Sequence, residues 1–255
     1  MNRNLKSRLA IATCCGRWQQ IAKEYDVGVE LDQYCQAENM DGEKGAKVET
    51  VIRKSLEEYR ALVFHAPFNE LFPAAIDPKA RELAMMRFNQ AAELALGYGI
   101  KKMVVHSGYV PFVYFKEWHI PRSVEFWTEF MADKPDDFEI CIENVLDDEP
   151  DMLAEIARQA DDPRIGLCYD IGHANIVGNC SQDEWLETMA PYLKHLHIHN
   201  NDGKRDYHRG ITEGSLDVER VLDGVLTKCT PETTITLEIL AGKESFEWLK
   251  AQGYL

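Results

Sequence analysis

The chain has 255 residues, of which 43 are acidic and 28 are basic, and its formal net charge is −15 at pH 7. Because nucleic acids and anionic membranes repel an acidic protein, this charge argues against a general affinity for either surface. The seven cysteines contain no CxxC pair, and their odd number favours reduced thiols in a cytoplasmic protein. The short apolar run near the N-terminus is far too short to span a bilayer, so we expect no membrane association.

Short apolar runs alternate along the chain with segments in which apolar residues recur every three to four positions. Runs rich in Val and Ile predict parallel strands buried on both faces, and the longer segments predict amphipathic helices. In chain order the predicted elements are strand Leu9–Cys14, helix Trp18–Tyr25, strand Gly28–Gln33, helix Lys47–Tyr59, strand Leu62–His65, helix Pro78–Leu96, strand Lys102–His106, helix Val124–Met131, strand Glu139–Glu143, helix Met152–Ala160, strand Gly166–Asp170, helix Gln182–Leu193, strand His195–His199, helix Val218–Lys228, strand Thr234–Glu238 and helix Ser245–Gln252.

This alternation of eight strands with eight helices predicts an α/β fold, the (β/α)8 TIM barrel, as a single domain over residues 1–255. A barrel of this kind takes about 250 residues, which agrees with the length of the chain. A doubly wound open sheet shares the alternation but rarely reaches eight repeats, and no GxGxxG follows the first strand.

Six of the predicted strands end on a residue that can bind a metal ion. The runs are ALVFH, KMVVH, EICIE, GLCYD, HLHIH and TITLE, and they place His65, His106, Glu143, Asp170, His197, His199 and Glu238 at strand ends. The chemistry of such barrels lies at the C-terminal ends of the strands, so we expect these side chains on one rim. A single histidine there is more often structural. Neighbouring buried carboxylates, however, repel one another unless cations lie between them, and the joint pattern therefore favours a metal centre.

Three further candidate ligands lie in loops just after strand ends: His173 in DIGHAN, and Asp206 and His208 in RDYHRG. With the rim residues they make nine candidates, more than the roughly four to six positions around one ion, so two to three divalent ions are expected. A mixed set of imidazoles and carboxylates suits zinc or manganese, with iron and cobalt as alternatives.

Four other cysteines and histidines near the strand ends are not predicted to bind metal. The alternation of side chains along a strand places Cys141 and Cys168 inside the barrel, where we expect them to pack rather than to bind metal. His195 is interpreted as a core residue. His199 shares a face with His197, and we expect it to contact the substrate beside the ligands.

Two loops are candidates for binding. Lys204, Arg205 and Arg209 lie beside the predicted ligands of the RDYHRG segment and are the best candidates for gripping a phosphate, although a solvated charge cluster explains them equally well. The segment Tyr109–Ser123 is rich in aromatic residues and predicts either a lid or a homodimer contact. His119, within that segment, is interpreted as unrelated to the metal centre.

The segments FHAPF, VVHSG, CIENV, CYDIGHAN, HIHNND, RDYHRGITEG and TLEIL resemble, in this order, the strand ends of the xylose isomerase-like TIM-barrel superfamily. That superfamily joins sugar phosphate isomerases and epimerases to AP endonucleases of family 2, the endonuclease IV type. The resemblance extends from His65 to Glu238. It implies that the metal site common to the superfamily is formed by Glu143, Asp170, His197 and Glu238.

The endonuclease branch has further metal positions. The resemblance to it implies that His65 and His106 join Glu143 around a second ion. A third ion would be held by His173, Asp206 and His208.

The two branches imply different reactions on a small, phosphorylated, sugar-like substrate. The complete set of nine ligands slightly favours phosphoester hydrolysis, in which Glu143 bridges two ions and the ions carry most of the catalysis. Isomerisation or epimerisation is the alternative, with Glu143 and Glu238 as catalytic residues that exchange protons beside a carbonyl. Cleavage of DNA at abasic sites ranks third because the chain is acidic. A barrel that only binds a sugar is the remaining, non-enzymatic interpretation.

Overall fold

A computed structural model describes residues 3–255 and shows a closed barrel of parallel strands in the order in which they occur along the chain. Within that range the strands are β1 (Leu9–Ala12), β2 (Gly28–Leu31), β3 (Ala61–His65), β4 (Lys102–His106), β5 (Glu139–Glu143), β6 (Ile165–Asp170), β7 (Leu193–Ile198) and β8 (Thr234–Leu237). The barrel closes where β1 pairs with β8, and Leu9 lies opposite Ile235. The predicted (β/α)8 TIM barrel is thereby confirmed.

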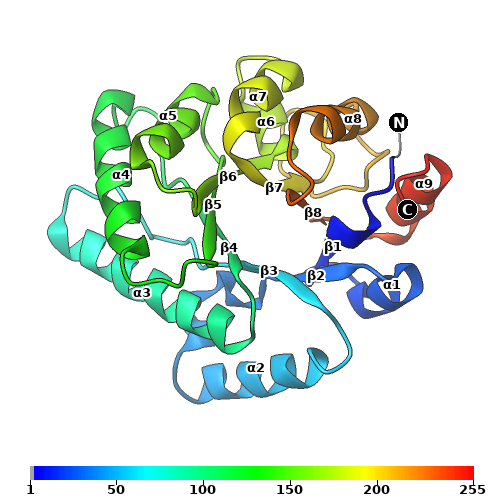
Figure 1. The fold of residues 1–255 in the computed structure, drawn as a ribbon, viewed down its shortest axis with the longest axis horizontal. Coiled ribbons are helices and arrows are strands. Elements are labelled where there is room, and N and C mark those ends of the chain that lie inside the picture. Colours follow the sequence, from blue (N-terminus) through cyan, green and yellow to red (C-terminus); the bar gives the residue numbers. More distant parts are fainter. Residues whose placement is uncertain (1–2) are drawn as a thin grey trace.

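The helices form a ring around the strands (Figure 1). Over the described residues the α-helices are α1 (Trp18–Tyr25), α2 (Gly42–Ser55), α3 (Pro78–Gly97), α4 (Lys116–Met131), α5 (Asp151–Ala160), α6 (Ile171–Val177), α7 (Gln182–Met189), α8 (Val218–Lys228) and α9 (Lys243–Ala251). Short 3-10 helices are η1 (Lys6–Arg8), η2 (Gln33–Cys35), η3 (Ala37–Met40) and η4 (Ala190–Tyr192). Between residues 3 and 255, none of these helices combines the length and the apolar character needed to cross a membrane.

Several helices differ from their predicted bounds: α2 begins and ends earlier than Lys47–Tyr59, and α7 ends before Leu193. The largest differences concern α4 and α6. Helix α4 begins at Lys116, eight residues before the predicted start, and runs through Pro121. A proline normally ends a helical pattern because it lacks an N–H and fixes its own backbone, so the sequence predicted a loop there. His119 therefore lies in α4 and is buried, whereas Phe112 and Phe115 in the preceding loop are exposed. The short helix α6 was not predicted at all.

The strands separate two apolar layers. Inside the barrel, Val63, Val104, Cys141 and Cys168 pack together as one small cluster. The alternate side chains of the same strands, Phe64 among them, face the helices. They belong to a much larger cluster between sheet and helices. This division confirms the predicted alternation, and Cys141 and Cys168 pack in the interior as expected.

Candidate metal centre

The side chains that end β5, β6, β7 and β8 meet at one point on the rim. A single ligand atom from each of four residues lies within 4.8 Å of the others, and the four are Glu143, Asp170, His197 and Glu238. The Nδ1 atom of His197 lies 3.2 Å from Oε1 of Glu143 and 3.4 Å from Oε2 of Glu238. It is 3.8 Å from Oδ2 of Asp170. One imidazole nitrogen thus faces three carboxylates.

A second group with the same spacing lies beside the first and consists of His173, His199, Asp206 and His208. The Oδ2 atom of Asp206 is 3.0 Å from Nε2 of His208 and 3.4 Å from Nε2 of His173. The Nε2 atom of His199, a residue predicted to contact substrate, lies 3.5 Å from Oδ1 of Asp206 and 3.1 Å from Oδ1 of Asp170. The structure therefore places His199 among the candidate ligands, between the two groups.

A third set surrounds the other oxygen of Glu143. Its Oε2 atom lies 3.3 Å from Nε2 of His65 and 3.5 Å from Nε2 of His106. The ring of Phe68 stacks on His106 with 4.1 Å between ring centroids and holds it against the rim. Glu143 is thus shared by two sets. The structure brings all nine predicted ligands, and His199, to the same end of the barrel.

Asn144 fixes the position of β6 relative to β5. Its side-chain amide donates to the carbonyl of Asp170 at 2.9 Å and accepts from the N–H of Asp170 at 2.8 Å. The carboxylate of Asp170 in turn caps α6 by accepting from the N–H of His173 at 2.7 Å. Sequence reasoning missed Asn144, although the CIENV segment places it directly after a predicted ligand.

Two asparagines order the loop that carries Asp206 and His208. Asn200 donates to the carbonyl of Ile211 and accepts from the N–H of Leu216, and Asn201 donates to the carbonyl of Gly172. Both asparagines are buried. They were not singled out in the sequence, where the HIHNND segment was the only available signal.

Three histidines of the centre have a ring orientation set by the backbone. The Nδ1 atoms of His65, His173 and His208 lie 2.9, 3.0 and 2.7 Å from the carbonyl oxygens of Ala66, Asn144 and Glu238. Because a carbonyl oxygen only accepts hydrogen bonds, each Nδ1 must carry a hydrogen, and in the neutral ring Nε2 carries a lone pair. In all three rings that lone pair faces a carboxylate, as the distances above show. Such an arrangement is repulsive unless a cation lies between the two groups or the ring takes up a second proton, and the pKa values of all three histidines are raised against the effect of burial.

The pKa values of the carboxylates in the first group are perturbed by burial, which is complete for Glu143 and Asp170 and partial for Glu238. Burial opposes ionisation of Glu143, but the nearby imidazoles of His197 and His106 hold its pKa well below the ordinary value. For Glu238, burial outweighs the same kind of attraction and raises the pKa. The Oε2 atom of Glu143 and the Oδ2 atom of Asp170 have no hydrogen-bond partner despite complete burial. Two buried acceptors without donors, facing imidazole lone pairs, fit divalent cations as the missing partners.

The three predicted phosphate-binding residues lie on the loop between β7 and α8, beside the second ligand group. Lys204 and Arg205 are exposed. The guanidinium of Arg209 lies over the ring of Tyr207, 4.1 Å from its centroid. Contact of these cations with a phosphate stays a prediction.

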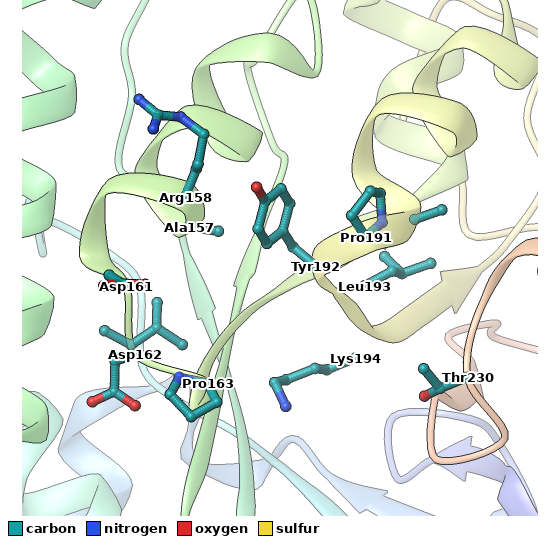
Figure 2. Close-up of a pocket in the computed structure, with 12 residues that line it drawn as sticks. Ala157, Arg158, Asp161, Asp162, Pro163, Pro191, Tyr192, Leu193, Lys194 and Thr230 are labelled. Carbon is teal, nitrogen blue, oxygen red and sulfur yellow. The ribbon is translucent and has the colours of Figure 1, made fainter.

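A cavity of about 450 Å³ lies at the opposite end of the barrel (Figure 2). Its lining includes Arg158 at the end of α5 and Tyr192, Leu193 and Lys194 where β7 begins. In barrels of parallel strands the N-terminal face serves stability and the C-terminal face carries the chemistry. We therefore place the functional site at the rim that holds the carboxylates and imidazoles.

The sequence profile described as xylose isomerase-like TIM barrel matches residues 27–252, and the chain belongs to this family. Among curated proteins it is similar to the uncharacterized protein MJ1311 of Methanocaldococcus jannaschii, with 30% identity over 185 residues. That match covers 64% of this chain and 59% of MJ1311. The chain spans about three fifths of the length of the curated relatives that it matches.

Solved structures of the same fold are more distant in sequence. A D-tagatose 3-epimerase-like protein superposes with a TM-score of 0.76 at 23% identity, over 96% of both chains. The TTHB071 protein from Thermus thermophilus, in crystals soaked with ZnCl2, superposes with a TM-score of 0.76 at 21% identity, over 96% of this chain and 97% of that one. At these identities the likeness establishes the fold.

Proposed function

We propose that this protein is a divalent-metal-dependent enzyme that hydrolyses a phosphoester of a small, sugar-like molecule. The proposal rests on the second ligand group. His173, His199, Asp206 and His208 form a complete set beside the first group, and a reaction that needs one ion has no use for it. Paired ions about 4 Å apart are the common arrangement for displacement at phosphorus. The zinc used to soak the crystals of the TTHB071 protein supports a metal of this kind.

When bound, divalent cations would supply Lewis acidity toward the phosphoryl oxygens and lower the pKa of the attacking water. The chain contributes the geometry. Glu143 has His65 and His106 beside one oxygen and His197 beside the other, so it holds the first and third sets at a fixed separation. Asp206 lies beside the imidazoles of His173 and His208 and holds these two rings of the second group at a fixed separation. Arg209, Lys204 and Arg205 lie on the adjacent loop, where they can bind the substrate phosphate.

The charge of the chain favours a small substrate. Even with three divalent ions bound, the net charge of −15 stays negative, and an acidic surface repels the many phosphates of a duplex. A single sugar phosphate carries only the charge that the metal centre and a few basic residues neutralise. Cleavage of DNA is therefore the least favoured of the hydrolytic reactions.

The test combines metal analysis with an assay of phosphate release. We expect two to three ions per chain in the native protein, and inorganic phosphate released from at least one member of a panel of sugar phosphates. Glu143→Gln should abolish this activity, and Asp206→Asn should lower both the metal content and the rate. Asp202→Asn is the matched control, because Asp202 lies on the same loop and its carboxylate, among residues 3–255, accepts only from the backbone N–H of Lys204. One ion per chain and no phosphate release would contradict hydrolysis.

A second reaction is favoured by a separate observation. Glu143 and Glu238 both lie within 3.4 Å of Nδ1 of His197, so a sugar held at the first group alone would have two carboxylates beside it. That placement suits isomerisation or epimerisation, in which one carboxylate removes a proton beside a carbonyl and the other returns one. The D-tagatose 3-epimerase-like structure supports this second candidate. The test is the incorporation of deuterium from D2O into a ketose. Isomerisation or epimerisation would be favoured over hydrolysis if the wild type and Asp206→Asn incorporate deuterium at the same rate.

A further inference from the structure

A buried carboxylate lies inside the barrel below the metal centre. Glu30 belongs to β2, its side chain points into the interior and only 1% of its surface is exposed. Its carboxylate accepts hydrogen bonds from Nε2 of His195 at 3.1 Å and from Nε2 of His197 at 3.0 Å. An apolar side chain would fill this position without the cost of burying a charge, so packing alone does not explain Glu30.

The contact with His197 completes a pattern across the rim. In His65, His173 and His208 a backbone carbonyl holds the proton on Nδ1 and leaves Nε2 facing the carboxylates. His197 is turned the other way. Its Nε2 atom points down to Glu30, and its Nδ1 atom faces Glu143 and Glu238.

The proton positions between these groups follow from donor and acceptor chemistry. The ammonium of Lys102 only donates, and it lies 3.2 Å from Oγ1 of Thr234. The hydroxyl of Thr234 lies 2.7 Å from Nδ1 of His195 and 3.4 Å from the carbonyl oxygen of Lys194. An ionised carboxylate only accepts, so Nε2 of His195, 3.1 Å from Glu30, carries the ring hydrogen and the Thr234 hydroxyl donates to Nδ1. That hydrogen points at Glu30, and a carboxylate with one imidazole donor in place accepts from His197 as well. The chain of contacts from the floor of the barrel thus keeps Glu30 as an acceptor on both sides.

We propose that Glu30 is a positioning residue for the metal centre: it holds the proton of His197 on Nε2 and so presents the Nδ1 lone pair to the cation shared with Glu143, Asp170 and Glu238. This inference rests on the proposed function, because it assigns His197 as a ligand. A carboxylate on the far nitrogen also makes an imidazole a stronger donor and fixes the plane of its ring. Glu30 itself does not touch the substrate or the ion.

The first test measures metal affinity rather than activity. Zinc affinity is determined by competition with a chromophoric chelator for the wild-type protein, Glu30→Gln and Val104→Ala. The amide that replaces the carboxylate has one oxygen that accepts and one NH2 group that only donates. It can therefore not accept from both imidazoles in the same way, and His197 loses its fixed orientation. We expect Glu30→Gln to bind zinc about 10- to 100-fold more weakly, the loss typical for the outer partner of a ligating histidine. Val104→Ala removes packing inside the same barrel and no hydrogen bond, and its affinity should match the wild type.

Urea unfolding of the metal-free variants separates a loss of fold from a loss of affinity. A folded Glu30→Gln protein with wild-type zinc affinity would overturn the assignment of Glu30 while leaving the metal centre intact. A wild-type protein that binds no zinc would instead overturn the proposed function.

A second test needs no variant. In wild-type protein labelled with ¹⁵N and loaded with ¹¹³Cd²⁺, the imidazole of His197 should couple to cadmium through Nδ1 and carry its hydrogen on Nε2. Coupling through Nε2 would place the cation in the interior among Cys168, His195 and His197, which also approach one another closely enough for a metal, and would overturn the inference.

Discussion

Asn144 holds the backbone of Asp170 through two hydrogen bonds, donating to its carbonyl at 2.9 Å and accepting from its N–H at 2.8 Å. Both partners are buried, and the asparagine replaces the pairing with β5, which ends where Glu143 lies opposite Cys168. The pair fixes the distance between two adjacent strand ends, each of which carries a candidate metal ligand.

Asn144→Ala should therefore weaken both stability and metal binding. The change leaves a buried N–H and a buried carbonyl without partners, at a cost of about 1–3 kcal/mol for each group. We expect the free energy of unfolding in urea to fall by about 2–6 kcal/mol in total, and the zinc content to fall with it. Asn179→Ala, at an exposed asparagine, should change neither quantity. Equal stability of the two variants would contradict the role assigned to Asn144.

Gly172 is the second position where the centre depends on local geometry. A Cβ atom built there would lie 1.9 Å from Cε1 of His199, which is far too short for two non-bonded atoms. Gly172→Ala should displace His199 from Asp170 and Asp206 and reduce the number of bound ions, measured by elemental analysis. Gly97→Ala is the matched control, because the nearest atom to its added Cβ is 3.7 Å away and belongs to a flexible arginine. If Gly172→Ala keeps the full complement of metal, His199 is not a ligand.

The sequence was sufficient to predict that the candidate ligands lie together, because they obey a local rule. His65, Glu143 and Asp170 each end a short apolar run, and parallel strands bring such ends together without further information. The loop ligand Asp206 was also recognisable from its DxH spacing. These predictions needed only the strand order, which the alternation of elements supplied.

The residues that were missed act through contacts between distant parts of the chain. Asn144 bonds to the backbone of another strand, and Asn200 bonds to a loop that returns eleven residues later. Glu30 carried a signal, since a charge inside the apolar run GVEL must find a partner when it is buried. The identity of that partner, His197, depends on the way the barrel closes and is absent from any local pattern.

Stability at mildly acidic pH should depend on His119. This histidine is buried in α4 against the rings of Tyr109 and Tyr114, and burial lowers its pKa from 6.5 to about 4. The unfolded chain therefore binds a proton at a higher pH than the folded one. The contribution of the neutral ring is complete above pH 6.5 and is lost as the pH falls toward 4, by up to about 3 kcal/mol.

The measurement compares urea unfolding at pH 7 and pH 4.5 in the wild type and in His119→Gln. All other titrating groups are common to the two proteins, so their difference isolates His119. The stability lost between the two pH values should be larger in the wild type by about 2–3 kcal/mol. The same loss in both proteins would show that His119 keeps an ordinary pKa.

Removal of metal should lower the melting temperature. A cation that binds only the folded protein stabilises it by about 2.7 kcal/mol when its free concentration is about 100 times the dissociation constant. For a chain of this length each kcal/mol corresponds to about 2–4 °C, so a chelator should lower Tm by about 5–10 °C, and added zinc should restore it.

The variant that tests the origin of this shift is Glu143→Gln. Glu143 lies within 3.5 Å of His65, His106 and His197 and is shared by two of the three ligand sets, so its loss should remove most of the zinc-dependent shift. Asp202→Asn, on the loop beside the centre, should keep the whole shift. A chelator effect of equal size in Glu143→Gln and in the wild type would locate the stabilising metal at the second ligand group or elsewhere in the protein, because neither the first nor the third set is complete without this carboxylate.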